Sequence, residues 1–163
     1  MAVPEGAPVR LNIGAGNKRI EGWLSIDLAG DPDIVADVKA LPLPDEYADE
    51  AMAIHVLEHI YRWDVPATLS EWRRVLKPGA LMVIEVPDLL KCCRNVLAGA
   101  GERMGIWGLM GDPGYCEPLM THKWAWSAEE LAQELRAAGF AKIKVREPHF
   151  HKKGRDMRVE ARA

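Results

Sequence analysis

Short apolar runs alternate with segments of helical periodicity along the chain. Between Val65 and Leu76, apolar residues recur at three- and four-residue steps, which predicts an amphipathic helix that ends at Lys77-Pro78-Gly79. The apolar runs are short, as expected for strands covered on both faces. This alternation is typical of an α/β sheet with crossover helices. The predicted strands are Val9–Gly14, Leu24–Asp27, Ile34–Asp37, Ala51–Val56 and Leu81–Val86.

The last part of the chain predicts a second helix followed by a hairpin. Ser127 and Glu130 have the spacing of a capping box, and Gly139 gives the stop of a helix over 127–138. Residues 143–146 and 157–161 then alternate like strands, with a connection too short for a crossover. The fold class that follows is α/β, with a doubly wound, mostly parallel sheet and a C-terminal antiparallel hairpin at one edge.

Residues 89–126 break this regularity. Glycines and two prolines punctuate the stretch, and it has no clean periodicity beyond a short helix near 89–98. Loop-rich insertions of this length are uncommon in compact domains and tend to be functional. We therefore expect a single domain over 1–163 with a loop-rich insertion at about 89–126.

Composition and charge limit the partners that the chain is expected to bind and the compartment in which it is expected to occur. The chain has 163 residues and a formal net charge of only -3, so no global field attracts a polyanion and no nucleic-acid partner is expected. The N-terminal stretch MAVPEGAPVR lacks a signal-peptide pattern, and no run approaches the roughly 20 apolar residues that span a bilayer. We expect a soluble, cytoplasmic protein with no membrane contact. Cys92, Cys93 and Cys116 fit neither a disulfide framework nor zinc-ligand spacing, so reduced thiols are expected.

The stretch LNIGAGNKRIEGWLSID, residues 11–27, holds a glycine-rich loop between the first two predicted strands. A dinucleotide fingerprint needs glycine where Arg19 stands and an acid about 20 residues beyond the loop, whereas Asp27 lies 11 residues after Gly16. The P-loop pattern fails as well, because no glycine-lysine-serine/threonine follows. Residues 15–23 allow little more than one helical turn, so little helix dipole is available for a pyrophosphate. The loop favours a ligand with one carboxylate and an amine, with a ribose near Asp27.

Four stretches in order and spacing resemble the class I S-adenosylmethionine-dependent methyltransferases, within them a short bacterial group close to the type 11 methyltransferase domain. They are LNIGAGNKRIEGWLSIDL (11–28), ADVKALPLPDEYADE (36–50), AIHVLEHI (53–60) and WRRVLKPGALMVIEVPD (72–88). The stretch HKWAWSAEELAQELRAAGF (122–140) is similar to the closing helix of the group. The resemblance implies a Rossmann-like, seven-stranded fold with a shortened first crossover helix, and S-adenosyl-L-methionine as cofactor.

The resemblance also implies roles for individual residues. Those that would bind the cofactor are Asn12, Gly14, Ala15, Gly16, Asp27, Leu28, Asp37, Val38, Leu41 and His55. Among them, Asp27 would bind the ribose, and Leu41 would line the adenine pocket. His55 would face the sulfonium, with Glu58 and His59 at the mouth of the site. Asn12 stands where the family often has an acid, and it would orient the loop or an amine through its amide.

An acceptor that must lose a proton needs a base, for which His59 and His122 are the candidates, each with side-chain packing as the alternative. The segment HFHKKGR, residues 149–155, reads either as a solvated turn or as a site for an anionic acceptor. No metal site is expected, because His149 and His151 lack further ligands at a recognisable spacing.

The leading hypothesis is a methyltransferase (EC 2.1.1.-) for the O- or N-methylation of a small-molecule acceptor, such as a sugar or another metabolite. The alternative is a non-catalytic protein that binds S-adenosylmethionine and serves as a partner or regulatory subunit, because the short first crossover leaves the cofactor weakly covered. Residues 89–126 or a partner chain would then have to cover the cofactor. The partner could be a second copy of this chain in a homodimer. An NAD-dependent oxidoreductase needs a fingerprint that this loop lacks.

Overall fold

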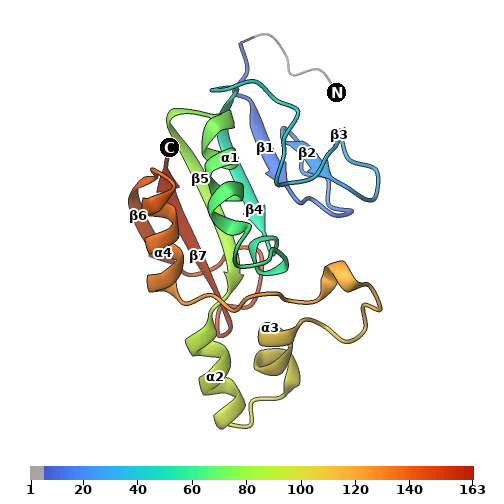
Figure 1. Cartoon of the computed structure of the whole chain (residues 1–163). Helices are drawn as coiled ribbons and strands as arrows, with labels where there is room; N and C mark the ends of the chain where they lie inside the picture. Colours follow the sequence, from blue (N-terminus) through green and yellow to red (C-terminus); the bar gives the residue numbers. More distant parts are fainter. Residues whose placement is uncertain (1–5) are drawn as a thin grey trace.

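A computed structural model describes residues 6–163 of the chain. Residues 1–5, which open the N-terminal stretch discussed above, lie outside the described part. Seven strands form one mixed sheet in the order β3-β2-β1-β4-β5-β7-β6 (Figure 1). The first five pair in parallel, and β7 is antiparallel to both β5 and β6. The α/β fold with a C-terminal antiparallel hairpin is therefore confirmed. The strands are β1 (Arg10–Ile13), β2 (Leu24–Asp27), β3 (Ile34–Val35), β4 (Ala48–Ile54), β5 (Leu76–Pro87), β6 (Ala141–Arg146) and β7 (Asp156–Arg162).

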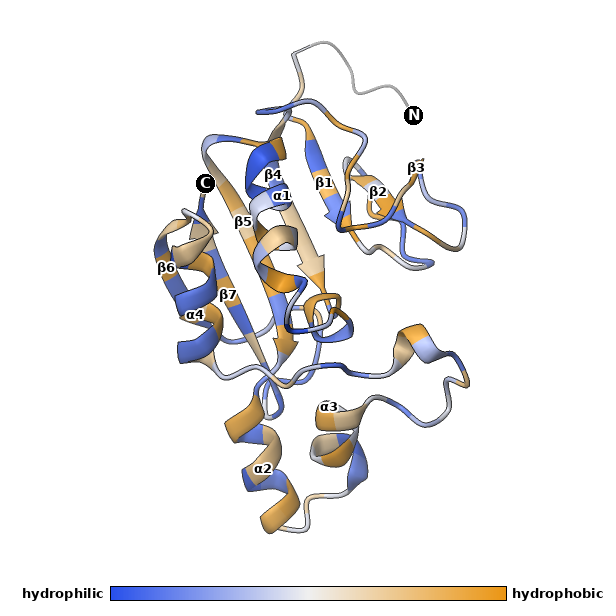
Figure 2. Ribbon diagram, in the orientation of Figure 1, coloured by the Kyte–Doolittle hydropathy of each residue, from blue (hydrophilic) through white to orange (hydrophobic). Residues whose placement is uncertain are grey.

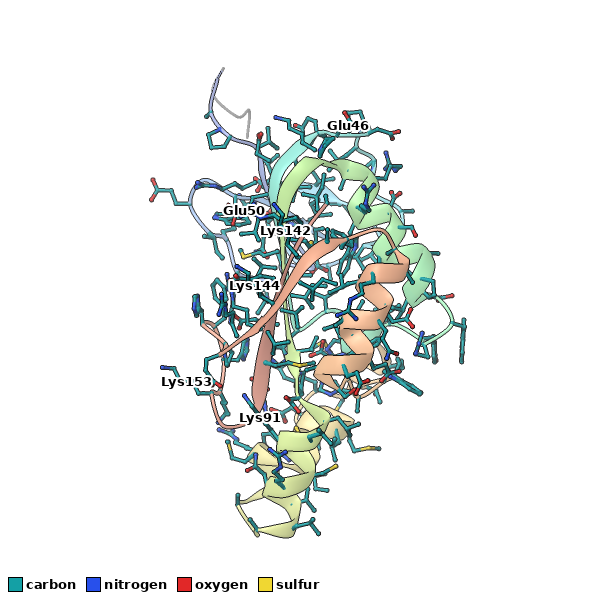
Figure 3. The ribbon with its side chains drawn as sticks, turned by 90° about the vertical axis from the view of Figure 1, so that its left-hand side faces the viewer. Glu46, Glu50, Lys91, Lys142, Lys144 and Lys153 are labelled. Atoms are coloured by element: carbon teal, nitrogen blue, oxygen red, sulfur yellow. The ribbon has the colours of Figure 1, made fainter. Side chains whose placement is uncertain are left out.

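Helices α1 (Val65–Val75) and α4 (Ala128–Ala137) lie side by side on one face of the sheet (Figures 1 and 3). Each presents a buried apolar stripe, with Leu69 and Trp72 from α1 and Leu131 and Leu135 from α4. The Trp72 indole also donates a hydrogen bond of 2.8 Å from Nε1 to the carbonyl of Val38, and so ties α1 to the segment after β3. Within residues 6–163, no α-helix lies between β1 and β4, in agreement with the predicted short crossover.

The N-terminal cap of α4 is present, but the predicted reciprocal capping box is wrong. The Ser127 hydroxyl accepts from the amide of Glu130 at 3.2 Å. The Glu130 carboxylate does not return this bond but accepts from Arg62 and from the Trp124 indole. Gly139 follows the helix with a φ of 89°, as its C-terminal stop requires.

Two strand boundaries differ from the prediction for a physical reason. Strand β5 starts at Leu76, directly after α1, and includes the residues expected to form a loop. Pro78 disfavours helix for the residue before it but tolerates extended backbone, so the chain passes from helix to strand without a turn. Strand β4 stops at Ile54, because His55 adopts the left-handed region with a φ of 56°.

The insertion at 89–126 contains more helix than its sequence predicts. It holds α2 (Leu89–Leu97), η2 (Glu102–Met104), α3 (Ile106–Met110) and η3 (Pro118–Met120), beyond the carboxyl end of β5 (Figure 1). Figure 2 shows apolar residues along α2 and α3. Their periodicity is hard to recognise in the sequence because each helix is short and a glycine follows soon after. The short helix expected near 89–98 is confirmed, and the three cysteines are free thiols, as expected.

Strand β6 forms one edge of the sheet. Its exposed Lys142 and Lys144 lie along this edge (Figure 3). Charged side chains on an edge strand oppose pairing with another sheet. This edge is therefore poorly suited to dimerisation by strand pairing.

Candidate active site

A cleft of about 800 Å³ opens at the carboxyl ends of β1, β2 and β4. Its walls are the glycine loop, the segments after β2, β3 and β4, residues 115–123 of the insertion, and the β6–β7 loop. Open parallel sheets bind ligands at this edge, because the loops after neighbouring strands diverge there. The cleft therefore brings together segments from both ends of the chain.

The glycine loop ends β1 and forms the floor of the cleft. Gly14 and Gly16 both have positive φ, 68° and 55°, which favours glycine over other residues. The amides of Gly14 and Ala15 donate to the carbonyl of Ile26 at 2.8 and 3.1 Å. A Cβ on Gly14 would lie only 2.4 Å from Cγ2 of Val56, so the loop is packed closely against the segment after β4.

Asp27 is part of this loop structure as well as a candidate ligand. Its Oδ2 accepts from the Gly16 amide at 2.7 Å, and its Oδ1 accepts from the Ala29 amide at 3.0 Å. A carboxylate oxygen accepts more than one hydrogen bond, so capacity remains for a ligand. Asn12 is buried and donates from its side-chain amide to the carbonyl of Lys18 at 3.3 Å. This bond ties Asn12 to the loop through its side-chain nitrogen, whereas the sequence suggested its amide oxygen.

Of the residues predicted to surround the adenine, Leu41 lies outside the cleft. Leu28, Asp37 and Val38 line the cleft, whereas Leu41 does not. The Leu41 side chain is 4% exposed and belongs to the hydrophobic core, and its amide donates to Glu71 on α1 at 2.7 Å. Leu41 thus turns toward α1 because the chain there is fastened to that helix.

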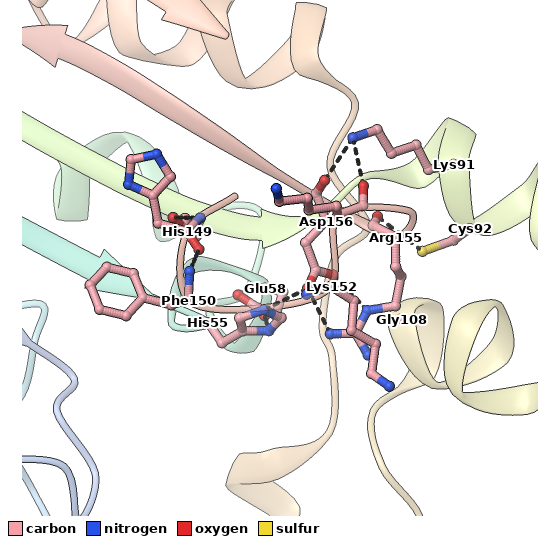
Figure 4. A network of polar contacts seen from close by, with 12 residues as sticks. His55, Glu58, Lys91, Cys92, Gly108, His149, Phe150, Lys152, Arg155 and Asp156 are labelled. Atoms are coloured by element: carbon pink, nitrogen blue, oxygen red, sulfur yellow. Dashed lines mark hydrogen bonds and ion pairs between the residues drawn. The ribbon is translucent and has the colours of Figure 1, made fainter. Parts of the chain in front are cut away.

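His55 lines the cleft and lies between two carboxylates (Figure 4). Its Nδ1 is 2.7 Å from Oε1 of Glu58, and its Nε2 is 3.4 Å from Oδ2 of Asp156. Burial disfavours the protonated imidazole, but the two carboxylates outweigh it and raise the pKa of His55 to about 9. The strained backbone at His55 is maintained by this pairing at the cleft wall.

The loop before β7 is largely exposed, as a solvated turn would be, but its last residue is not. Arg155 is buried and donates to both oxygens of Asp156, at 2.6 and 2.9 Å, so it is not available to an anionic acceptor. His151 lines the cleft with its ring centroid 4.0 Å from that of His55. Burial and the charge of His55 lower the pKa of His151 to about 4.

Only one of the two candidate bases reaches the cleft. His59 lines it, whereas His122 lies behind, with the ring centroids of the two histidines 4.9 Å apart. Burial lowers the pKa of His122. The prediction that Glu58 lies at the mouth of the site is wrong. Its side chain is 1% exposed, because the chain at 57–59 turns it inward beneath His55.

Glu85 is a site residue that the sequence analysis missed. It is fully buried on β5, and its two carboxylate oxygens accept from the amides of His149 and Phe150 at 2.8 and 3.0 Å. Arg158 on β7 balances the charge at 3.3 Å. Glu85 thereby holds the β6–β7 loop against the cleft. A charge inside the apolar run VIEVP was the available signal, because a buried charge needs partners.

Comparisons with known proteins agree with this geometry. Residues 12–84 match the family model described as a methyltransferase domain. A probable S-adenosylmethionine-dependent methyltransferase of Mycolicibacterium smegmatis is 31% identical over 61% of this chain and 31% of its own length. Residues 12–84 of this chain are therefore similar to a methyltransferase domain.

Other methyltransferases share part of its sequence or its fold. The ubiquinone/menaquinone biosynthesis C-methyltransferase of Caulobacter vibrioides is 44% identical over 33% of this chain and 22% of its own length. The solved 1,6-didemethyltoxoflavin-N1-methyltransferase of Burkholderia thailandensis, with bound 1,6-didemethyltoxoflavin and S-adenosylhomocysteine, has a TM-score of 0.67 at 19% identity. That alignment covers 95% of this chain and 70% of the other chain. The chain spans less than a third of the length of either curated relative. Among its described residues, no helix is long and apolar enough to cross a membrane.

Proposed function

We propose that this chain transfers the methyl group of S-adenosylmethionine to a small-molecule acceptor bound in the same cleft. One observation carries the proposal. A single cavity runs from the glycine loop and Asp27 to His59, Met120 and His151, so one chain provides walls for both a cofactor and an acceptor. Its volume of about 800 Å³ is in the upper part of the range of small-molecule sites, about 300–1,000 Å³.

The residues of the cofactor end fit the expected ligand. The Cβ of an alanine at position 16 would meet no atom within 4 Å, so the loop leaves open space there. We assign the methionine moiety to this space, the ribose to Asp27, and the adenine to the wall formed by Leu28, Asp37 and Val38. The bound cofactor supplies an electrophilic methyl group, and the protein supplies position and exclusion of water.

The acceptor end favours a molecule with an apolar or aromatic body over a free sugar. Its walls include Tyr115, Leu119, Met120 and Phe150, with few polar side chains among them. A sugar would leave most of its hydroxyls without partners on such walls. His59 is the side chain that we propose to contact the reacting group of the acceptor. The names of the relatives include both C- and N-methyl transfer, so they do not indicate which atom of the acceptor is methylated in this chain.

The test is calorimetric titration with S-adenosylmethionine and S-adenosylhomocysteine, followed by transfer of isotopically labelled methyl to a panel of phenols, quinols, aromatic amines and sugars. NAD is the negative control. Binding with turnover of an aromatic acceptor supports the proposal. Tight cofactor binding without turnover on any acceptor would favour a non-catalytic partner or regulatory subunit. The absence of cofactor binding would refute both.

The same experiment has a matched pair of variants. Met120→Glu places a charge at the acceptor end and should reduce turnover at least tenfold with unchanged affinity for S-adenosylhomocysteine. Asp27→Asn at the cofactor end should weaken the affinity for S-adenosylhomocysteine. If both variants act on the same step, the division of the cleft into two ends is wrong.

A further inference from the structure

Two clusters on the inner wall of the cleft each contain two histidines and one carboxylate. One consists of His55, His151 and Asp156, and the other of Glu58, His59 and His122. Within each cluster, one nitrogen or oxygen atom of every residue lies within 4.8 Å of those of the other two. In each cluster two residues are close in sequence, Glu58 with His59 and His151 with Asp156, and the third comes from a distant segment.

In the first cluster the Asp156 carboxylate is already paired, and Nε2 of His55 has only its ion contact with that carboxylate at 3.4 Å and no hydrogen bond within the described residues. The Asp156 carboxylate accepts from Arg155 and from the Lys152 amide, and His55 lies between two carboxylates. A metal ion there would lie beside the buried guanidinium of Arg155 and would have to replace these contacts. Electrostatic repulsion and existing pairing both oppose an ion at this place.

The second cluster contains a buried carboxylate with an unmatched oxygen. Glu58 is 1% exposed, and only one of its two carboxylate oxygens has a close partner among the described residues. Oε1 has the ion contact with His55 at 2.7 Å, which leaves Oε2 without any partner in the described chain. A buried oxygen in this condition costs free energy unless a ligand compensates it.

Both histidines of this cluster have the outer hydrogen bond that metal-binding histidines usually have. Nδ1 of His59 is 3.3 Å from the carbonyl of Thr121, and Nδ1 of His122 is 3.0 Å from the carbonyl of Gly108. Since a carbonyl only accepts, each Nδ1 carries the hydrogen, and each Nε2 retains its lone pair. Such a contact fixes the tautomer and the orientation of a ligating ring.

The cluster is also fixed by the backbone. The amides of Lys123 and Trp124 donate to the carbonyl of Glu58, at 2.6 and 3.3 Å. These bonds hold the segment that carries His122 against the turn that carries Glu58 and His59. The ligands therefore do not depend on a mobile loop for their position.

We propose that Glu58, His59 and His122 bind one divalent transition-metal ion, with Zn²⁺ as the ion that this donor set favours. Two imidazoles and one carboxylate are a known set for zinc sites that keep an open coordination position. Ligand atoms around tetrahedral zinc lie about 3.4 Å apart, so the side chains would approach one another by roughly 1 Å. Because His59 lines the cleft, the open position of the ion faces the cleft.

The consequence for catalysis rests on the proposed function. An acceptor with a hydroxyl or thiol group would coordinate the ion and ionise more easily, because a bound metal favours the deprotonated ligand. His59 would then be a metal ligand and not the free general base that its sequence context suggests. The acceptors favoured by this site are phenols and other hydroxyl compounds that bind metals.

The experiment measures metal binding directly and needs no turnover. The full chain, without an affinity tag and stripped with a chelator, is titrated with Zn²⁺ by calorimetry and with Co²⁺ by visible absorption. We expect one equivalent to bind, with the Co²⁺ spectrum of nitrogen and oxygen ligands and no thiolate band. His122→Ala should weaken binding at least 100-fold, and Glu58→Gln should act in the same direction.

Two matched controls come from the remaining histidines. His149 is exposed and outside both clusters, and His151 belongs only to the first cluster. His149→Ala and His151→Ala should bind Zn²⁺ with the affinity of the unmodified chain. Circular dichroism of each variant confirms that it is folded. Should Glu58→Gln not fold, the partly exposed His59→Ala replaces it.

The proposal is overturned if the unmodified chain binds no stoichiometric Zn²⁺, if His122→Ala leaves the affinity unchanged, or if His151→Ala abolishes binding. Calorimetry with S-adenosylhomocysteine on the same samples separates this result from the proposed function. Cofactor binding without metal binding would refute only the metal site. Metal binding without cofactor binding would support the metal site and refute the proposed methyltransferase activity.

Discussion

Replacement of Gly14 by alanine tests the packing of the glycine loop. At this position φ is 68°, which costs a residue with a side chain roughly 1–2 kcal/mol. The added Cβ would lie 2.4 Å from Cγ2 of Val56, an overpacking that costs about 1–3 kcal/mol. Together these lower the free energy of unfolding by about 2–5 kcal/mol. At about 2–4 °C per kcal/mol for a chain of this size, Tm should fall by roughly 4–20 °C.

Gly16→Ala is the matched control for this prediction. Gly16 also has a positive φ, 55°, but its added Cβ would meet no atom within 4 Å. Only the conformational cost applies, so Tm should fall by roughly 2–8 °C. Since the new methyl group projects into open space beside the loop, Gly16→Ala should instead weaken S-adenosylhomocysteine binding at least tenfold. Stability and cofactor affinity should thus respond to different glycines.

A double-mutant cycle isolates the contact with Val56. Val56→Ala removes both Cγ atoms, so Gly14→Ala should cost less in that background, by about 1–2 kcal/mol. Differential scanning calorimetry gives Tm for the four proteins. Equal Tm values for Gly14→Ala and Gly16→Ala, or no coupling with Val56→Ala, would refute the close contact that we describe.

Three further predictions concern Asp27 at the cleft and two residues of α1, Trp72 and Glu71. Asp27→Asn removes the charge that holds the loop amides and, by our proposal, the ribose. Two charge-assisted hydrogen bonds contribute roughly 1.5–3 kcal/mol each, so calorimetry should show at least about 100-fold weaker S-adenosylhomocysteine binding, and unchanged affinity would move the ribose elsewhere. Trp72→Phe keeps most of the apolar volume but leaves the carbonyl of Val38 unpaired, so urea unfolding should show a loss of about 1–3 kcal/mol, and equal stability would contradict this hydrogen bond. The hydrogen bond from Arg74 lowers the pKa of Glu71, so Glu71 stabilises the fold above its unfolded-state pKa, and this stability is lost as pH falls through the folded-state pKa. Glu71→Gln should therefore make urea stability less dependent on pH between about 5 and 3, whereas parallel curves would argue against the pair.

The sequence predicted most of the sheet because its strands are local apolar patterns. Leu24–Asp27 was found with both boundaries correct, and the hairpin at the sheet edge was found from alternation and a short connection. Boundaries were missed where backbone conformation decides. His55 ends β4 in a left-handed conformation that cannot be predicted from its residue type.

The candidate site was predictable only where it is local in sequence. Gly14, Gly16 and Asp27 follow from the spacing of one loop and strand. Asp156 could not be placed beside His55 in the same way, because their contact depends on the antiparallel register of β5 with β7, in which Pro87 pairs with Asp156. Leu41 was misplaced because its burial depends on a hydrogen bond to α1 that lies 30 residues away in sequence.

The hydrogen bonds from the β6–β7 loop to Glu85 affect which substitutions that loop can tolerate at the cleft. The Glu85 carboxylate holds the amides of residues 149 and 150, which every residue except proline possesses. The side chains of residues 149 and 150 are therefore not needed for this anchor. Phe150 and His151 can be exchanged for residues of other size and polarity while the backbone stays where it is. A change of acceptor then requires few substitutions, and none of them in the sheet.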